Sequence, residues 1–183
     1  MHMIFRILMV FLNSKKSTRL SMFDTSSVSM RATLTDIDFA GHINNGMYFS
    51  IFDLGRFDLM FRSGVWEIMR KNKWTPVVQT ETITFRKSVR LGTRFSQETR
   101  LLGLDDKCIY FEQRIVAEGE IYARAYIATR MTSKQGAVSN EEILAAVGLQ
   151  VPEDRVVPEW IHQWREQGAL PGSRKPAPHN WIR

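Results

Sequence analysis

The feature that most constrains the fold is an apolar stretch, long enough for a helix and hydrophobic around most of its circumference. Apolar residues recur at helical spacing over residues 45–65, with the sequence NGMYFSIFDLGRFDLMFRSGV. Asp53 and Arg56, three residues apart, fall on the opposite side, and Gly64 marks the expected end of the helix. A helix of this kind is buried on several sides. The rest of the chain is therefore expected to wrap around it.

The sequence after Pro76 changes to a period of two, which is typical of strands that bury one face. Strands are predicted over residues 27–34, 77–89, 93–103, 108–117 and 121–133. Short connections join the last four strands, which we interpret as an antiparallel meander. The sequence therefore predicts an α+β fold in which a curled antiparallel sheet wraps around the long helix. An open sheet leaves edges that a second copy can pair with or cover, so we expect a homodimer or a dimer of dimers.

The remaining segments divide the chain into three parts. Shorter helices are predicted over residues 66–73, 139–148 and 159–168. Ser139 and Gly148 are expected to cap the second of these helices. The three parts are an N-terminal apolar and basic segment, a central domain and a C-terminal extension with a basic tail, over residues 1–25, 26–148 and 149–183.

Composition and charge exclude several classes of protein. Cys108 is the only cysteine, which excludes an intrachain disulfide, and the four histidines lie too far apart in sequence for a zinc motif. The net charge of +6 attracts anions. The basic residues are nevertheless dispersed, and no nucleic-acid-binding motif accompanies them. We therefore expect a protein of a reducing, cytoplasmic setting that holds no metal and binds no nucleic acid.

The apolar segment MIFRILMVFL, residues 3–12, is too short to span a bilayer, which takes about 20 apolar residues. The segment does not match a signal peptide, because the basic residues Lys15 and Lys16 follow the apolar run, whereas in a signal peptide they precede it. Two interpretations stay open. The segment packs as a helix on the domain or a partner subunit, or it lies in a membrane interface with the help of Lys15, Lys16 and Arg19.

The segment just before the long helix brings together residue types that can act on a carbonyl group. Asp38 and His42 lie four residues apart and flank Gly41, which lets the backbone approach a ligand closely. The long helix begins near Asn44 or Asn45, so its free N–H groups and positive dipole end point into the same space. A developing oxyanion would find hydrogen-bond donors there. The same residues also suit a plain turn and helix cap, and that interpretation stays open.

These residues resemble the signature of hotdog-fold thioesterases of the 4-hydroxybenzoyl-CoA thioesterase group. The family pattern Asp-x-Asp-x-x-Gly-His-x-Asn-Asn-x-x-Tyr leads from the first strand into the central helix. The chain matches it at Asp36, Asp38, Gly41, His42, Asn44, Asn45 and Tyr48. The resemblance implies a hotdog fold and an acyl-CoA thioesterase without a bound cofactor, with CoA as part of the substrate. Ala40 stands where many plant-type acyl-carrier-protein thioesterases have an asparagine, so a network that uses that amide is absent.

The resemblance also implies a role for each matched residue. It makes Asp38 the nucleophile or general base and Asp36 a structural residue. His42 then orients the loop, activates water or donates to the thioester. The predicted catalytic residues are Asp38, His42 and Asn45, and those predicted to bind substrate are Gly41, Met47, Tyr48, Ile51, Phe52 and Arg86.

Further candidates lie on the strands. Gln79 and Glu81 are candidates on the strand that flanks the helix, although a strand glutamate is usually exposed. Arg86, Lys87 and Arg90 either hold the CoA phosphates or protect a sheet edge from wrong pairing. The first alternative function is an acyl-CoA-binding protein without turnover. A hydratase or dehydratase on the same fold is disfavoured, because no second histidine is well placed to face an acid.

Overall fold

The central helix forms where the apolar periodicity predicts it. In the computed structural model, which describes residues 2–172 and 175–180, helix α2 spans Asn45–Ser63. The side chain of Asn44 caps its first turn by accepting a hydrogen bond from the Gly46 backbone N–H. Gly64 ends the helix in the left-handed region, at φ 79°. The capping residue is thus Asn44, and Asn45 is the first residue of the helix.

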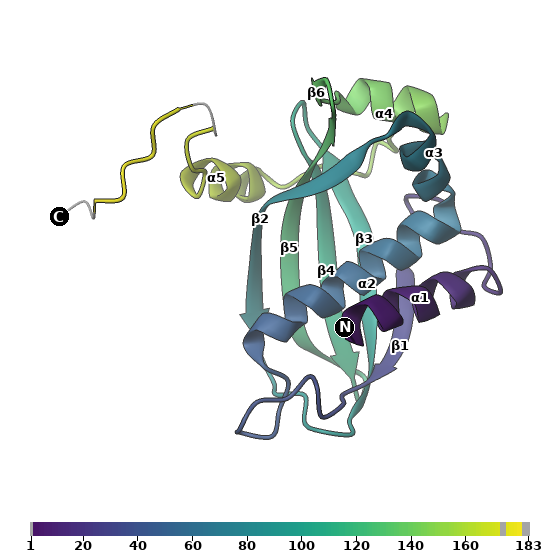
Figure 1. Ribbon diagram of the computed structural model, residues 1–183, viewed down its shortest axis with the longest axis vertical. Coiled ribbons are helices and arrows are strands. Elements are labelled where there is room, and N and C mark those ends of the chain that lie inside the picture. The colour runs from purple at the N-terminus through teal and green to yellow at the C-terminus, as the bar shows by residue number, and fades with distance from the viewer. Residues whose placement is uncertain (1, 173–174, 181–183) are drawn as a thin grey trace.

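A curled antiparallel sheet wraps around α2 and confirms the predicted α+β architecture (Figure 1). Its strands run in the order β1-β3-β4-β5-β2, and a short sixth strand pairs with β5. Their bounds are β1 Ser26–Arg31, β2 Thr75–Phe85, β3 Arg94–Leu104, β4 Ile109–Ala117, β5 Glu120–Ser133 and β6 Gly136–Ala137. The turn between β4 and β5 has positive φ at both Glu118 and Gly119, as a two-residue hairpin requires.

The prediction that the last four strands form one meander was wrong at β2. Strands β3, β4 and β5 do form a meander, but β2 pairs with β5 at the far edge and not with β3. The place beside β3 is taken by β1, in a register that pairs Val28 with Gln97. The connection over residues 86–93 therefore crosses the end of the sheet instead of forming a hairpin.

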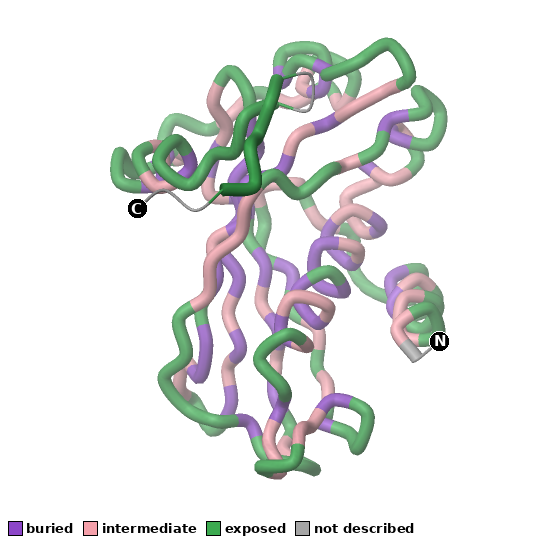
Figure 2. Tube along the Cα trace, turned by 60° about the vertical axis from the view of Figure 1, so that its left-hand side comes forward, coloured by how far each residue is buried: buried purple, intermediate pink, exposed green. Residues whose placement is uncertain are grey.

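The core lies between α2 and the concave face of the sheet, where buried residues of both line up (Figure 2). Ile51, Phe52 and Leu59 of α2 are fully buried there. The prediction that Arg56 lies on the side of the helix opposite the apolar residues was wrong. Its side chain is only 7% exposed and points toward the sheet. Its guanidinium donates to Gln113 Oε1 at 2.6 Å, so the charge is solvated by a buried amide.

Helix α1, His2–Ser14, packs on the outer side of α2 (Figure 1). Val10 contacts Leu54 and Phe61 in a small apolar cluster, and the rings of Phe11 and Phe61 meet edge to face at 5.1 Å. This confirms the packing interpretation for residues 3–12. Among the described residues, no helix has the length and apolar character needed to cross a membrane.

The remaining helices close the upper end and the outer face of the sheet. Helices α3 and α4 span Val65–Asn72 and Asn140–Val147, and α5 spans Glu159–Gln167. Val157 and Ile161 pack against Cys108 and Tyr110, which alternate with inward-facing residues of the sheet. Gly103 permits this contact, because a Cβ at that position would lie 2.7 Å from Val157. The C-terminal extension therefore covers part of the outer sheet face. Cys108 is buried and packed as predicted, but it lies directly before β4 and not within the strand.

Candidate active site

The segment before α2, residues 36–44, forms a small hairpin that we call the site loop. The backbone N–H of Asp38 donates to the carbonyl of His42 at 3.0 Å, and that of Gly41 donates to the carbonyl of Asp38 at 3.1 Å. Gly41 has φ +77°, which a side chain would strain. The N–H of Ile43 then donates to the Val89 carbonyl at 2.8 Å. The site loop is thus fastened to the connection between β2 and β3.

Asp36 anchors the start of the site loop, as expected for a structural residue. Its side chain is fully buried and accepts hydrogen bonds from the Thr33 N–H and hydroxyl, both at 2.8 Å, and from Arg6 at 2.7 Å. Its carbonyl accepts the N–H of Asn44 at 2.9 Å, so the same residue also holds the start of α2. Burial alone would raise the pKa of Asp36. The hydrogen bonds from Arg6 and Thr33 and the charge of Arg6 have a larger effect in the opposite direction, so the pKa is lowered.

Asp38 and His42 face each other across the site loop. His42 Nδ1 lies 3.7 Å from Asp38 Oδ1, which is longer than a hydrogen bond but close enough for a water or substrate atom to contact both. The side chain of Asp38 is 22% exposed and that of His42 is 35% exposed. Asp38 Oδ1 also accepts the N–H of Ala40 at 2.9 Å, which fixes the carboxylate in the turn. The pair is therefore held in place and accessible.

A cavity of about 120 Å³ opens at the start of α2; we call it the small cavity. His42 lines it, whereas Asp38 does not. The small cavity brings together four of the predicted site residues, His42, Asn45, Tyr48 and Arg86, and Phe85 of β2 closes one side. The N-terminus of α2 lies at this cavity, so the positive end of the helix dipole favours an oxyanion there. Tyr48 is buried, and its ring meets that of Phe85 edge to face at 5.1 Å.

The other predicted substrate-binding residues lie nearby but do not line the small cavity. Gly41 is in the site loop, and Met47 packs partly buried against the core. Ile51 and Phe52 are fully buried on the side of α2 that faces the sheet. A ligand that contacts these two residues would have to enter the core.

The basic residues of the connection between β2 and β3 are partly compensated. Arg86 Nη2 lies 3.0 Å from Glu120 Oε1, and Lys87 pairs with the other oxygen of the same carboxylate. Arg90 forms a backbone bridge with His42, which places its side chain at the same end of the molecule as the site loop. The connection itself thus carries three cations, of which two are paired with one glutamate.

Of the two strand candidates, Glu81 faces α2 and Gln79 does not. Gln79 accepts a hydrogen bond from the Cys108 thiol at 3.0 Å, on the outer side of the sheet. Burial raises the pKa of Glu81, opposed by the charge of Arg56 and reinforced by that of Asp53. Glu81 is therefore a half-buried acid that faces the central helix. Among the described residues, no three His, Cys, Asp or Glu side chains are grouped so that they could hold a metal ion.

Comparison with known proteins places this geometry in a family. A model of the thioesterase-like superfamily matches residues 32–164, which include the site loop, α2 and strands β2 to β6. The chain therefore belongs to the thioesterase-like superfamily. It is 36% identical over 110 residues to "Protein THEM6" of Danio rerio, a match that covers 60% of this chain and 54% of that protein. The chain thus spans little more than half the length of this relative.

Solved structures confirm the hotdog fold. The probable thioesterase YbaW of Escherichia coli superposes with a TM-score of 0.62 at 21% identity, over 73% of this chain and 99% of that one. SAV2348 of Staphylococcus aureus, solved in complex with CoA, superposes with a TM-score of 0.56 at 16% identity, over 78% of this chain and 100% of that one. Helix α1 lies outside the part matched by the family model.

Proposed function

We propose that the protein is a thioesterase that hydrolyses an acyl- or aryl-CoA to the free acid and CoA, without a bound cofactor. The observation that carries this proposal is the accessible pair of Asp38 and His42 at the N-terminus of α2, with 3.7 Å between their nearest atoms. Membership of the thioesterase-like superfamily supports the reaction type. The CoA complex of the Staphylococcus aureus protein supports CoA as the carrier.

The proposed reaction begins with the thioester carbonyl in the small cavity, its oxygen toward the first turn of α2. Asp38 takes a proton from a water that attacks the carbonyl carbon, or attacks that carbon itself to give an anhydride that water then opens. The negative charge that develops on the carbonyl oxygen is stabilised by the helix N-terminus and by Asn45. When the C–S bond breaks, the CoA sulfur carries the electron pair away and takes a proton, for which His42 is the donor.

A non-catalytic acyl-CoA-binding protein is the second candidate, because Asp38 and His42 are not hydrogen-bonded to each other. In that case the same cavity and basic end of the molecule hold the ligand, and no bond is broken. Slow, non-saturating release of thiol together with tight binding would favour this candidate.

We further propose that two copies pair through the exposed edge of β2. Val77, Val78 and Phe85 of this strand are 47%, 40% and 42% exposed, which is unusual for a strand of this composition at an open edge. Pairing of two β2 strands would satisfy their free backbone groups and cover these side chains. The result is a homodimer, and a dimer of dimers remains compatible with it.

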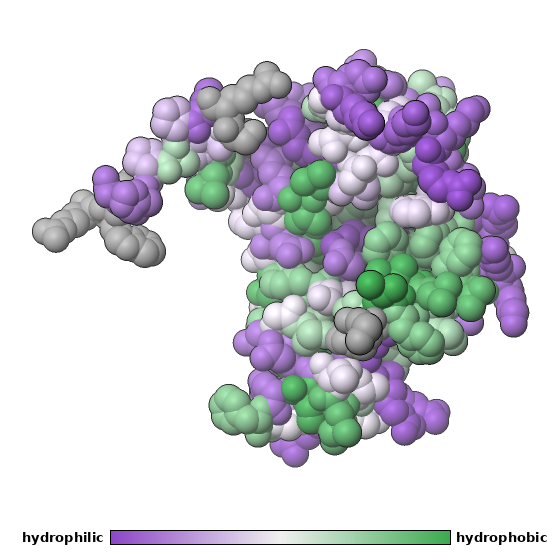
Figure 3. Space-filling model, in the orientation of Figure 1, coloured by the Kyte–Doolittle hydropathy of each residue, from purple (hydrophilic) through white to green (hydrophobic). Residues whose placement is uncertain are grey.

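We also propose that α1 contacts a membrane surface at the cytoplasmic side. Ile4, Phe5 and Leu8 are 73%, 63% and 50% exposed, and hydrophobic side chains gather over α1 in Figure 3. Lys15 and Lys16 follow at the end of the helix, where they would meet anionic headgroups. The helix would then lie in the interface and not span it.

The thioesterase proposal is tested by the release of free thiol from a panel of acyl-CoAs, from acetyl to palmitoyl with benzoyl and phenylacetyl. Asp38→Asn is expected to lower kcat/KM at least ~100-fold, the scale of a lost general base. Asp106→Asn, an exposed acid in the turn between β3 and β4, serves as the matched control and should keep full activity. Equal rates in wild type and Asp38→Asn would overturn the mechanism.

A further inference from the structure

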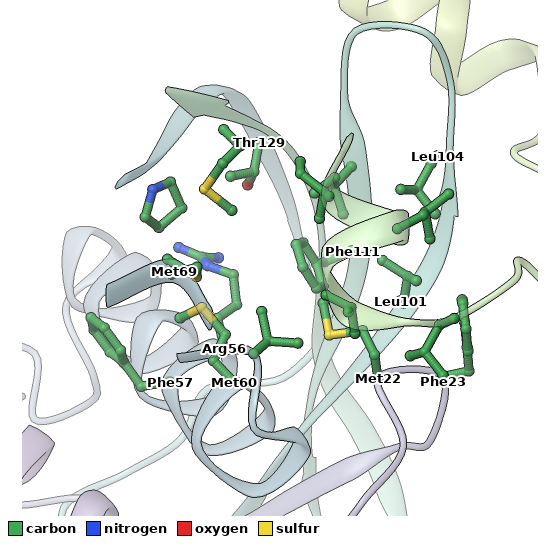
Figure 4. A pocket seen from close by; sticks show the side chains of 18 of the residues that line it. Met22, Phe23, Arg56, Phe57, Met60, Met69, Leu101, Leu104, Phe111 and Thr129 are labelled. Carbon is green, nitrogen blue, oxygen red and sulfur yellow. The ribbon is translucent and has the colours of Figure 1, made fainter. Parts of the chain in front are cut away.

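A second cavity, of about 160 Å³, lies at the opposite end of α2 from the site loop; we call it the large cavity. It is bounded by α2, α3, α4 and the inner face of the sheet, and its wall is almost entirely apolar (Figure 4). Four methionines, Met22, Met60, Met69 and Met131, contribute to the wall. Methionine side chains are unbranched and adaptable, so this wall can adjust to a flexible ligand.

The polar groups of the large cavity are few and already engaged, with one exception. Arg56 is paired with Asp53 and with Gln113, so its charge is not available to bind an anionic ligand. Thr129 is the exception, because its hydroxyl is buried and donates to or accepts from none of the described residues. The cavity therefore suits an apolar group and offers no site for the carboxylate or phosphate end of a ligand.

The small and the large cavity lie along the same seam, between α2 and the edge strand β2. The small cavity is bounded by Tyr48 of α2 and Phe85 of β2, and the large one by Arg56 of α2 and Pro76 of β2. Glu81 lies between them on β2 and feels the charges of Arg56 and Asp53. The two cavities therefore lie at opposite ends of one side of α2, with Glu81 of β2 between them.

The side of α2 between the two cavities carries little bulk. Gly46, Ser50 and Asp53 recur there at helical spacing, and none of the three is fully buried. Asp53 is half-exposed and lines the large cavity.

Distance and volume together select the length of the ligand. Asp53 lies about 12 Å along the helix axis from Asn45. With C–C bonds of about 1.5 Å at near-tetrahedral angles, each carbon of an extended chain advances about 1.25 Å, so roughly ten carbons cover this stretch. A cavity of about 150 Å³ holds a benzene molecule, so the large cavity has room for about six more. An aromatic ring carried directly on the thioester carbon would end in the small cavity.

We propose that the substrate is an aliphatic acyl thioester of about ten to sixteen carbons, whose chain follows the α2–β2 seam and whose methyl end occupies the large cavity. This inference rests on the proposed thioesterase function and names its substrate class. It assigns the choice of chain length to residues around the large cavity, far from Asp38 and His42 in space.

The test fills the large cavity without touching the site loop. Leu144 of α4 lines the cavity and is half-buried, so Leu144→Trp can place its ring inside. Ala145→Trp adds the same bulk on the exposed side of the same helix and is the matched control. We expect Leu144→Trp to lower kcat/KM for palmitoyl-CoA at least tenfold and to leave butyryl-CoA unchanged, with no effect of Ala145→Trp on either. Val147→Phe fills the cavity from the next turn if Leu144→Trp does not fold.

A binding measurement separates this inference from the proposed function. Calorimetry with non-hydrolysable thioether analogues of hexadecyl- and butyl-CoA reports chain binding in the absence of turnover. If no thiol is released but Leu144→Trp weakens only the hexadecyl analogue, the thioesterase proposal fails and the chain-length inference holds. If wild type hydrolyses benzoyl-CoA and short chains as well as palmitoyl-CoA, or Leu144→Trp affects all chains equally, the inference is overturned while the thioesterase proposal stands.

Discussion

Arg6 connects the outer helix α1 to the site loop. Its guanidinium donates to Asp36 and to Thr33, and it is 18% exposed in a contact that spans thirty positions of sequence. Because Asp36 in turn holds Asn44, the position of the first turn of α2 depends on this contact. Arg6 is thus a positioning residue for the site loop, although it lies outside the part of the chain that the family model matches.

Replacement of Arg6 is expected to destabilise the protein and to loosen the site loop. Arg6→Met should lower the free energy of unfolding by about 3 kcal/mol, the scale for a buried ion pair that loses one partner. Urea unfolding measures this, with Lys16→Met as the exposed control. The lowered pKa of Asp36 adds stability above the ordinary carboxyl value of 3.8, and acid removes it as the pH falls through the folded pKa. The difference between Arg6→Met and wild type should therefore shrink in acid, and a constant difference would contradict this account.

Glu81 has the opposite linkage, because its pKa is raised. In the unfolded chain this carboxyl ionises near its ordinary pKa of 4.5, whereas in the folded chain it ionises at a higher pH. The folded state therefore loses stability as the pH rises from 4.5 through the raised pKa, and the cost is complete above it. Glu81→Gln is expected to raise the melting temperature at pH 7 and to match wild type near pH 4. Glu153→Gln is the exposed control, and a lower melting temperature for Glu81→Gln at pH 7 would contradict the prediction.

At the scale of elements, the sequence predicts what is local and misses what depends on distant pairing. The apolar period predicts α2, and the residues of the site loop are adjacent to it in sequence, so the position of Asp38, His42 and Asn45 near the start of α2 can be predicted without coordinates. The position of β2 cannot be predicted in this way. Strand β1 occupies the place beside β3, so β2 pairs with β5 instead. Arg6 is missed for the same reason, since nothing in an apolar helix indicates which acid its one arginine will meet.

The edge strand β2 offers a test at this scale. Val77→Lys places a charge on the exposed edge, where it opposes pairing with a second copy. Sedimentation velocity is expected to show a dimer for wild type and a monomer for Val77→Lys. Val156→Lys changes a more exposed valine outside the strands and should stay dimeric. A monomeric wild type at micromolar concentration would remove the basis for pairing through β2.

At the scale of the whole molecule, the apolar surface over α1 and the basic residues at its end form one face. Co-sedimentation with vesicles that contain an anionic lipid is expected to recover the wild-type protein. Leu8→Glu should abolish recovery, because a charge then stands in the middle of the exposed apolar side. Leu170→Glu is the matched control on the C-terminal tail, where the leucine is also exposed. Equal recovery of both variants would exclude α1 as the contact.

The contact between Arg6 and Asp36 has a practical consequence for anyone who shortens the chain. The family match begins at residue 32, so a trimmed version that starts there would keep every residue that matches the family pattern. It would nevertheless lose strand β1 of the sheet and the cation that neutralises the buried carboxylate of Asp36 at the start of the site loop. If such a short form is inactive, the loss of activity can therefore come from the missing N-terminal residues that hold the site loop in place. It would not show that Asp38 and His42 lack a catalytic role.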